Sequence, residues 1–302
     1  MNKYYYKVYG LILESEICIP ELLSVEPGNY NNSVYIKYSN MPQRIKNEVN
    51  EKRKFNFDKK ESWFLIDNIA IFRVCNGNEI TIESLGGSKE KIKAFILGSS
   101  LGCILIQRNI PAIHGGTIIS NDKAIIITGD MGAGKSTLTS SLRMNGYKFL
   151  SDDVSAINLY DDYAVVKAAY PQQKLCRDCV IRLGLNIDEL KPIEDGRDKF
   201  AVLCKDQFEE DDKVLHSVFY IVVNEEIQDI NIHEIKGIEK VKLLIKNIYR
   251  IDIAAEMGLE GEYFNNIIKT AKHIKFYRIE RPKDILCIDE EVELVKSKIS
   301  LI

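Results

Sequence analysis

The chain has 302 residues, of which 45% are hydrophobic and 28% are charged, as in an ordinary soluble globular protein of one large or two small domains. Its 41 basic and 44 acidic side chains give a formal charge of −3, so the composition offers no basic field that would attract nucleic acid or an anionic membrane. Any affinity for phosphate must therefore come from a local site.

The first part of the chain has the pattern of short strands. Residues 4–18 mix aromatic and β-branched side chains with polar ones, which predicts a strand or hairpin that Pro20 ends. Turn signals such as Asn76-Gly77-Asn78 separate further predicted strands, at 33–38, 62–67, 69–74 and 79–83. We therefore predict a small β-rich N-terminal lobe over residues 1–85, which Gly86-Gly87-Ser88 ends.

The hydrophobic period changes to that of a helix at Lys89, and this helix is predicted to run to about Asn109. Two strands follow at 114–121 and 124–128, and the second is apolar enough to be central in a sheet. A helix is predicted at 135–145, with Gly146 as its C-cap. The remaining predicted elements are a strand ending at Leu150, strands at 163–168 and 216–223, and helices at 237–250, 258–272 and 288–300. We therefore predict an α/β nucleotide-binding domain over residues 86–302.

The cysteines and the apolar segments bear on where the protein works. Seven scattered cysteines argue against a disulfide framework and indicate a reducing compartment. Cys176 and Cys179 form a lone C-x-x-C, without the second pair of ligands that a zinc site needs. The first residues lack the apolar core of a signal peptide, and the longest apolar cluster, 92–106, is too short for a bilayer. We expect a cytoplasmic protein that engages neither membrane nor nucleic acid.

One segment matches G-x-x-x-x-G-K-[ST] in full: Gly129-Asp130-Met131-Gly132-Ala133-Gly134-Lys135-Ser136. It follows an apolar strand and opens an amphipathic helix, which is the context that a phosphate-binding loop requires. Glycines let the backbone turn its N–H groups inward, and the helix adds its positive end. We expect this run and Thr137 to bind ATP, with Lys135 on the β- and γ-phosphates and Ser136 on Mg²⁺.

A pair of aspartates follows the next apolar strand. Asp152 and Asp153 stand at its carboxyl end, which in an open α/β sheet would be beside the phosphate loop. Phosphoryl transfer needs a carboxylate near the metal and a group that accepts the proton of the hydroxyl. Adjacent residues of a strand point in opposite directions, so the pair could do both. His114, before Gly115-Gly116, is either an active-site neighbour or a histidine that serves only the structure.

Together these residues resemble the HPr kinase/phosphorylase family, bacterial protein-serine kinases with a fold similar to phosphoenolpyruvate carboxykinase. The family has a His-Gly segment, a strand, a G-D-S-G-x-G-K-S loop, a helix ending in Gly and an Asp-Asp pair, in the order found here over residues 95–160. The resemblance implies that Asp153 is the general base, that Asp152 lies near the metal and that His114 supports the base. Met131 stands where the family has serine, and the family's Glu-x-Arg-Gly-Leu-Gly segment is absent.

Looser motifs resemble a divergent branch of that family, the serine kinases of ribosomally made peptide pathways, which include lasso-peptide tailoring kinases. The motifs are Glu14-Ser15-Glu16-Ile17 with Pro20-Glu21-Leu22, the run from Tyr170 to Asp178, Arg197-Asp198-Lys199-Phe200, and Tyr277-Arg278 before Pro282. This resemblance implies transfer to a serine hydroxyl of a precursor peptide or protein. It makes Arg177, Arg197 and Lys199 candidate phosphate or acceptor contacts. Asp178 lies in the stretch nearest to the wider family's missing Glu-x-Arg-Gly-Leu-Gly segment, which makes it a candidate second metal ligand. The family often forms hexamers, so a homo-oligomer is compatible with it.

Three other functions remain open at this stage. The acceptor could be a small metabolite such as free serine, which needs a closed pocket, whereas a peptide needs an open groove. The protein could be a regulator that binds ATP without transferring phosphate, although such a binder would not need Asp152 and Asp153. It could also hydrolyse ATP without transfer.

Overall fold

The computed structural model describes residues 3–193, 198–259, 261–283 and 287–300, which form a mixed α/β fold with three β-sheets. The chain divides into two compact units. The first unit comprises residues 1–110, 193–197 and 250–264, and the second comprises 111–192, 198–249 and 265–302. The boundary between the predicted lobe (1–85) and the predicted nucleotide-binding domain (86–302) falls inside the first unit, and this division stays a prediction.

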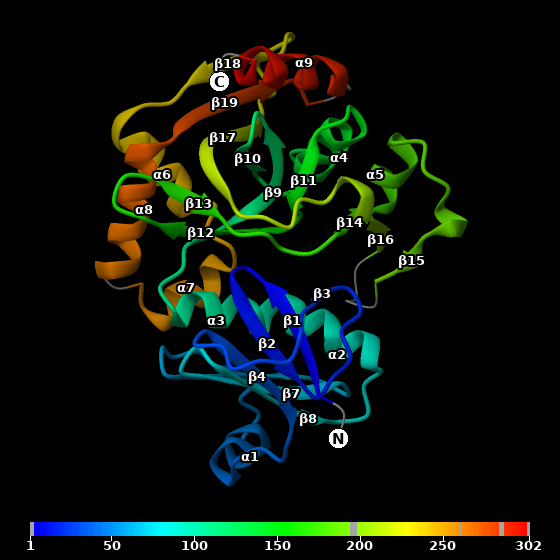
Figure 1. Ribbon diagram of the computed structural model, residues 1–302, viewed down its shortest axis with the longest axis vertical. Coiled ribbons are helices and arrows are strands. Elements are labelled where there is room, and N and C mark those ends of the chain that lie inside the picture. Colours follow the sequence, from blue (N-terminus) through cyan, green and yellow to red (C-terminus); the bar gives the residue numbers. More distant parts are fainter. Residues whose placement is uncertain (1–2, 194–197, 260, 284–286, 301–302) are drawn as a thin grey trace. The chain divides into compact units, whose positions relative to one another are not determined.

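The first unit is built on an eight-stranded sheet with the order β3-β1-β2-β4-β8-β7-β6-β5 (Figure 1). The first two strands form the predicted hairpin, because Tyr9 and Gly10 adopt the left-handed conformation, with φ of 54° and 74°. Helix α1, Gln43–Asn50, was not predicted. The strands are β1 Tyr4–Val8, β2 Leu11–Ser15, β3 Leu23–Ser24, β4 Ser33–Tyr38, β5 Phe55–Asn56, β6 Glu61–Ile66, β7 Ala70–Cys75 and β8 Glu79–Ser84.

The helix predicted from Lys89 is present, but it is not regular. It consists of α2 (Lys89–Phe95), a π-helical turn (Ile96–Ser100) and α3 (Leu101–Gln107). The Ser88 side chain accepts a hydrogen bond from the backbone N–H of Lys91, which caps the start of α2. Helix α7 (Ile251–Met257) also belongs to the first unit. It was not predicted and lies between the two helices predicted at 237–250 and 258–272.

The second unit contains a sheet in which β10 pairs with both β9 and β17. The pairings β9–β10, β10–β17, β17–β13, β13–β12 and β12–β9 close into a ring, and β11 also pairs with β9. The strands are β9 Ala112–Ser120, β10 Lys123–Gly129, β11 Lys148–Ser151, β12 Val154–Leu159, β13 Ala164–Val166, β17 Lys213–Val223, β18 Asn231–Glu234 and β19 Lys275–Arg281.

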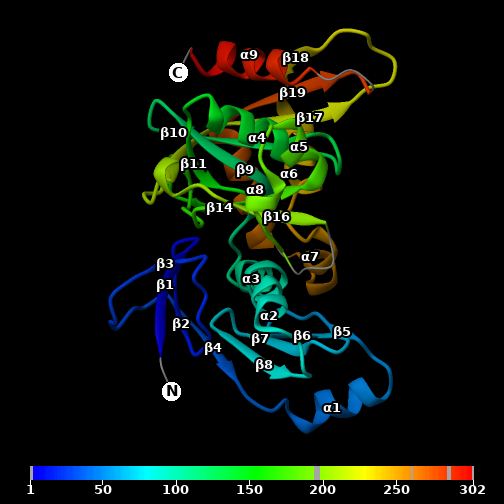
Figure 2. The same cartoon turned by 90° about the vertical axis from the view of Figure 1, so that its right-hand side faces the viewer.

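Strands β10, β17 and β19 run parallel, so their carboxyl ends, Gly129, Val223 and Arg281, reach the same edge of the sheet. Helices α4 (Lys135–Met144) and α9 (Ile288–Ile299) cover one face through a shared apolar core (Figures 1 and 2). On the opposite face the Thr128 hydroxyl donates to the side chain of Asn247, which follows α6 (Gly237–Lys246). Helix α8 spans Gly261–His273.

A third, three-stranded sheet in the second unit was not predicted. Its order is β14 (Gln172–Cys176), β16 (Lys199–Leu203) and β15 (Lys191–Pro192), and α5 (Arg177–Arg182) packs on it. It has a small core of its own, made by Phe149, Leu175, Cys179, Val180, Phe200, Val202 and Cys204. Across the described segments, no helix has the length and apolar character that crossing a bilayer takes.

Candidate active site

The glycine-rich loop joins the end of β10 to the start of α4. Gly129, Gly132 and Gly134 have φ of 153°, 77° and 106°, values that residues with a Cβ rarely adopt. A Cβ on Gly129 would also lie only 2.4 Å from the carbonyl oxygen of Ile221 on β17. The first turn of α4 has no acidic residue and no side-chain cap, so its backbone N–H groups are available to an anion.

Lys135 folds back over this loop. Its Nζ donates hydrogen bonds to the carbonyl oxygens of Gly129 at 2.9 Å and of Asp130 at 3.0 Å. Burial lowers the pKa of Lys135, although the carboxylates of Asp153 and Asp130 oppose that shift. The ammonium group is therefore held at the loop, where an incoming phosphate could replace its two carbonyl partners.

Two other residues of the loop differ in what they contact. Asp130 Oδ1 accepts hydrogen bonds from the Tyr220 hydroxyl at 3.0 Å and from Lys246 Nζ at 2.7 Å. Burial alone would raise the pKa of Asp130, but the hydrogen bonds from Lys246 and Tyr220 lower it below its usual value. Asp130 thus anchors the loop to the rest of the second unit through its side chain. Met131 is 99% exposed, so its side chain contributes almost nothing to packing.

Strand register brings His114 and the aspartates to the same edge as the loop. Gly115 of β9 is paired with Thr128 of β10, so His114 lies next to the end of β10. The N–H of Gly115 donates to the carbonyl oxygen of Asp153 at 3.2 Å, and Val154 pairs with His114. Asp152 and Asp153 occupy the junction at which β11 gives way to β12 along one edge of β9.

This placement corrects one step of the sequence-based reasoning. The aspartates were predicted to lie beside the loop by the geometry of an open α/β sheet, but β11 and β10 are not neighbours in this sheet. Instead β9 lies between them and runs antiparallel to both β10 and β11. The aspartates still reach the loop, because β9 starts beside the end of β10 and carries the β11–β12 junction on its other edge.

Within this edge, His114 and Asp153 are in direct contact. His114 Nδ1 lies 3.3 Å from Asp153 Oδ1 and also 3.3 Å from the Asp153 carbonyl oxygen. Burial lowers the pKa of His114, while the Asp153 carboxylate opposes the shift. The imidazole is therefore mainly neutral at pH 7, and with its proton on Nδ1 it can donate to Asp153. The His114 ring also lies against Tyr249, with 5.9 Å between ring centroids.

Asp152 has a different environment from Asp153. Its Oδ2 accepts a hydrogen bond from the backbone N–H of Lys174 on β14 at 2.8 Å. Burial and then the charge of Asp153 raise the pKa of Asp152 to about 7, whereas Lys174 and Lys199 lower it. Like charges held close together disfavour ionisation, and this effect adds to burial in raising the pKa of Asp152.

Lys174 is a residue of this site that we did not predict. Burial would lower its pKa, but Tyr170, Asp153, Tyr249 and Asp152 together raise it well above the usual range for a lysine. Its side chain is also hydrogen-bonded to the Tyr170 phenol. The sequence held one signal, a lysine between Gln173 and the buried Leu175 in a strand-like run, but only the three-stranded sheet places it against the aspartates.

The four residues predicted to contact phosphate, acceptor or a second metal, Arg177, Asp178, Arg197 and Lys199, differ in whether they lie near the aspartates. Lys199 on β16 is close enough to lower the pKa values of His114 and Asp152. Arg177 instead forms a bidentate pair with Asp198 at 2.7 and 3.1 Å, and stacks over Phe200 at 5.1 Å. Asp178 lies in the first turn of α5 and is exposed, and Arg197 lies outside the described residues. Lys199 is therefore the candidate that the structure brings to the aspartates.

The predicted Mg²⁺ site fits a metal that arrives with a nucleotide. Among the described residues there is no group of three or more His, Cys, Asp or Glu side chains that could hold a metal by themselves. Mg²⁺ is usually held by one or two carboxylates together with substrate phosphates and waters. Ser136 at the start of α4 carries a hydroxyl of the required kind, and Asp152, whose pKa is raised to about 7, would have to lose its proton to act as a ligand.

Comparison with known proteins does not assign the chain to a family. No family model matches the chain, and no curated protein matches it. A solved structure of the Hpr(Ser) kinase/phosphatase from Coxiella burnetii is similar at 12% sequence identity and a TM-score of 0.34. That similarity covers 63% of this chain and 97% of the other. Overlap at this level leaves the function to be argued from the geometry of the site.

Proposed function

We propose that the protein is an ATP-dependent kinase that transfers the γ-phosphoryl group to a serine hydroxyl. The observation that supports this most is the contact between Asp153 and His114 at the edge of the sheet where the loop of Lys135 also lies. A protein that only bound nucleotide would need the loop but not a carboxylate held by a neutral imidazole beside it. The arrangement thus combines a phosphate site with a candidate general base.

In the proposed reaction the serine oxygen forms a bond to the γ-phosphorus, while the bond from that phosphorus to the β–γ bridging oxygen breaks and ADP leaves. Asp153 accepts the hydroxyl proton, and His114 orients Asp153 through its Nδ1. Lys135 and the N–H groups at the start of α4 stabilise charge on the phosphates. Mg²⁺, when bound through Ser136 and Asp152, would neutralise charge on the β- and γ-oxygens.

The acceptor that we propose is a serine of a ribosomally made precursor peptide, of the lasso-peptide type, or of a protein. Support comes from the sequence motifs shared with peptide-tailoring kinases. Lys199 adds a cation beside the aspartates, where it could contact the transferring phosphoryl group.

The test is a transfer assay with γ-labelled ATP and Mg²⁺, in which mass spectrometry identifies each product. The acceptors are peptides ending in serine, free serine and HPr, and Asp153→Asn serves as the control for enzyme-dependent transfer. A phosphorylated peptide supports the proposal, whereas phosphoserine or phospho-HPr assigns the protein to a different substrate class. Release of inorganic phosphate without transfer, or ATP binding without turnover, would refute the kinase proposal in favour of an ATPase or a regulator.

A further inference from the structure

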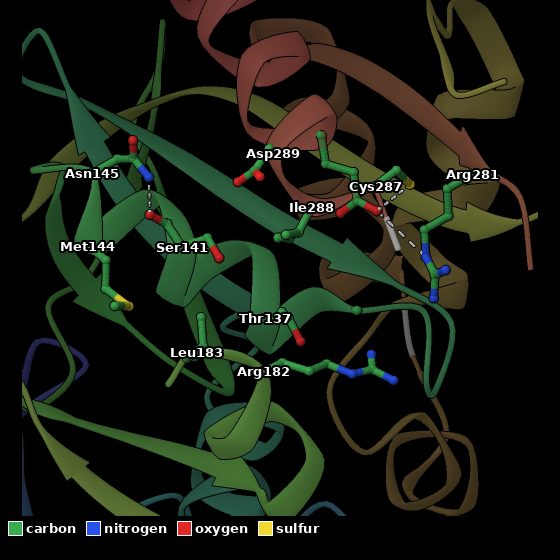
Figure 3. Close-up of a pocket in the computed structure, with 12 residues that line it drawn as sticks. Thr137, Ser141, Met144, Asn145, Arg182, Leu183, Arg281, Cys287, Ile288 and Asp289 are labelled. Atoms are coloured by element: carbon green, nitrogen blue, oxygen red, sulfur yellow. Dashed lines mark hydrogen bonds and ion pairs between the residues drawn. The ribbon is translucent and has the colours of Figure 1, made fainter. Parts of the chain in front are cut away.

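The second unit contains a cavity of about 230 Å³ beside the phosphate loop (Figure 3). Its walls come from one face of α4, from the end of α5, and from the end of β19 with the start of α9. Thr137, Ser141 and Met144 of α4 line it at spacings of four and three, so they share one face of the helix, and the C-cap residue Asn145 continues this wall. This wall extends about 12 Å along the helix, at about 1.5 Å per residue.

The cavity begins at the loop and leads away from the aspartates. Gly134 and Thr137 line it, whereas neither Asp152 nor Asp153 does. In a phosphate loop the backbone N–H groups hold the α- and β-phosphates, and the lysine reaches the β- and γ-phosphates. The γ-phosphate therefore belongs on the side of Asp153, and the α-phosphate belongs at the start of α4. The part of the nucleotide attached to the α-phosphate must leave the loop where the cavity begins.

We propose that this cavity binds the purine nucleoside of the nucleotide, an inference that rests on the proposed function. The order of cavity, loop and aspartates then matches the order of nucleoside, phosphates and acceptor in the reaction. The volume is below the roughly 300–1,000 Å³ typical of pockets that hold a whole small molecule or cofactor, so it suits one part of the nucleotide rather than all of it.

The two arginines that line the cavity lie at its loop end. Figure 3 shows the guanidinium groups of Arg182 and Arg281 on the side of Thr137, at the start of α4, and Met144 and Asn145 at the other end. Arg281 Nε is held by the carbonyl oxygen of Ala133 at 3.0 Å, so this cation is fixed at the loop. Two arginines near the loop suit an α-phosphate and the ribose next to it.

The rest of the lining suits a flat heterocycle with an amino group. Leu183 of the α5 end and Ile288 of α9 are partly buried apolar side chains that can cover the faces of a ring. Asp289 is exposed at the wall, and in Figure 3 its carboxylate and the Ser141 side chain come from opposite helices. A carboxylate accepts hydrogen bonds only, so it favours a base that offers N–H donors, as purines with exocyclic amino groups do.

The experiment blocks the cavity without touching the loop. Ser141→Phe adds a ring on the cavity face of α4, and Ser141→Ala is the matched control that leaves the cavity open. Isothermal titration calorimetry on the full chain measures the affinity of each variant for ATP and for inorganic tripolyphosphate, both with Mg²⁺. We expect Ser141→Phe to weaken ATP binding by about tenfold or more, which is about 1.4 kcal/mol, and to leave tripolyphosphate binding unchanged. Ser141→Ala, which removes one hydroxyl and leaves the cavity open, should weaken ATP binding far less than Ser141→Phe does.

Lys135→Ala separates failure of this inference from failure of the proposed function. If Lys135→Ala weakens both ligands but Ser141→Phe binds ATP normally, the nucleoside lies elsewhere and the inference is wrong. An equal loss of both ligands in Ser141→Phe also overturns it, because the effect then comes from the loop. If Lys135→Ala changes neither affinity, or if the wild type binds neither ligand, the phosphate site itself is refuted.

Discussion

Replacing Glu291 by glutamine should remove a pH dependence of the stability of the second unit. Glu291 in the first turn of α9 is only 3% exposed. Burial raises its pKa to about 7, although Arg281 and a hydrogen bond from the Cys287 thiol act in the opposite direction. The Arg281 Nε to Glu291 Oε1 distance is 3.7 Å, too long for a strong ion pair. The protonated acid is therefore the favoured form in the folded protein below about pH 7.

The magnitude follows from the two pKa values. Glu291 has a pKa of 4.5 without the folded environment and about 7 within it. Between these values the folded protein keeps a proton that the unfolded chain loses, so the stabilising contribution is complete below pH 4.5 and is lost as pH rises through 7. At about 1.4 kcal/mol per pKa unit, the free energy of unfolding should fall by about 3 kcal/mol through this group.

The assay compares the urea unfolding of wild type and Glu291→Gln across pH 4.5 to 8. Hydrogen exchange of the amides in α9 and β19 is the readout of unfolding. Amide exchange is needed because the sole tryptophan, Trp63, lies in the first unit and its fluorescence does not report on α9. Groups that titrate in both proteins, such as Asp152, cancel in the difference. The difference should change by about 3 kcal/mol over this range. Two pH–stability curves that run parallel would refute the reasoning.

Three other substitutions test the site and its support. Asp153→Asn should bind ATP no more weakly than wild type in calorimetry but lower kcat by about 10²–10⁴-fold, the usual contribution of a general base; near wild-type turnover would contradict the assignment. Lys174→Met removes a cation that lowers the pKa of Asp152, so the acidic limb of the pH–rate profile should move to higher pH. An unmoved limb would contradict the role of Lys174 in keeping Asp152 ionised. Gly116→Ala puts a Cβ 2.7 Å from Thr139 Cγ2 on α4. The overpacking should cost about 1–3 kcal/mol in urea unfolding, and unchanged stability would mean that α4 moves aside freely.

Local signals in the sequence predicted the parts of the site that are continuous in the chain. The loop from Gly129 to Ser136 is specified by glycines at positions of positive φ, and the strand and helix on either side have clear periods. The helix at 288–300 was predicted from the same kind of period and is confirmed as α9. Such features depend on residues a few positions apart, which a sequence displays directly.

Features that depend on distant pairing were not predicted. Nothing in the sequence showed that β9 would lie between β10 and β11, because register between strands is set by the whole sheet. Lys174 and Lys199 lie on different strands, β14 and β16, and only their pairing brings both cations near the aspartates. Strand β19 was also missed, although its end carries Arg281 to the edge of the sheet. A long-range contact of this kind has no local signature.

The three-stranded sheet of β14, β16 and β15 gives the site a dependence on local unfolding. This sheet has its own small core, and it holds the N–H of Lys174 against Asp152 and positions Lys199. Segments with a small separate core often open as units at a free energy below that of global unfolding. In an opened molecule the phosphate loop would be intact, yet the aspartates would lose both lysines. We therefore expect the fraction of molecules competent for the proposed transfer to follow the protection of β14 amides rather than the melting of the whole chain.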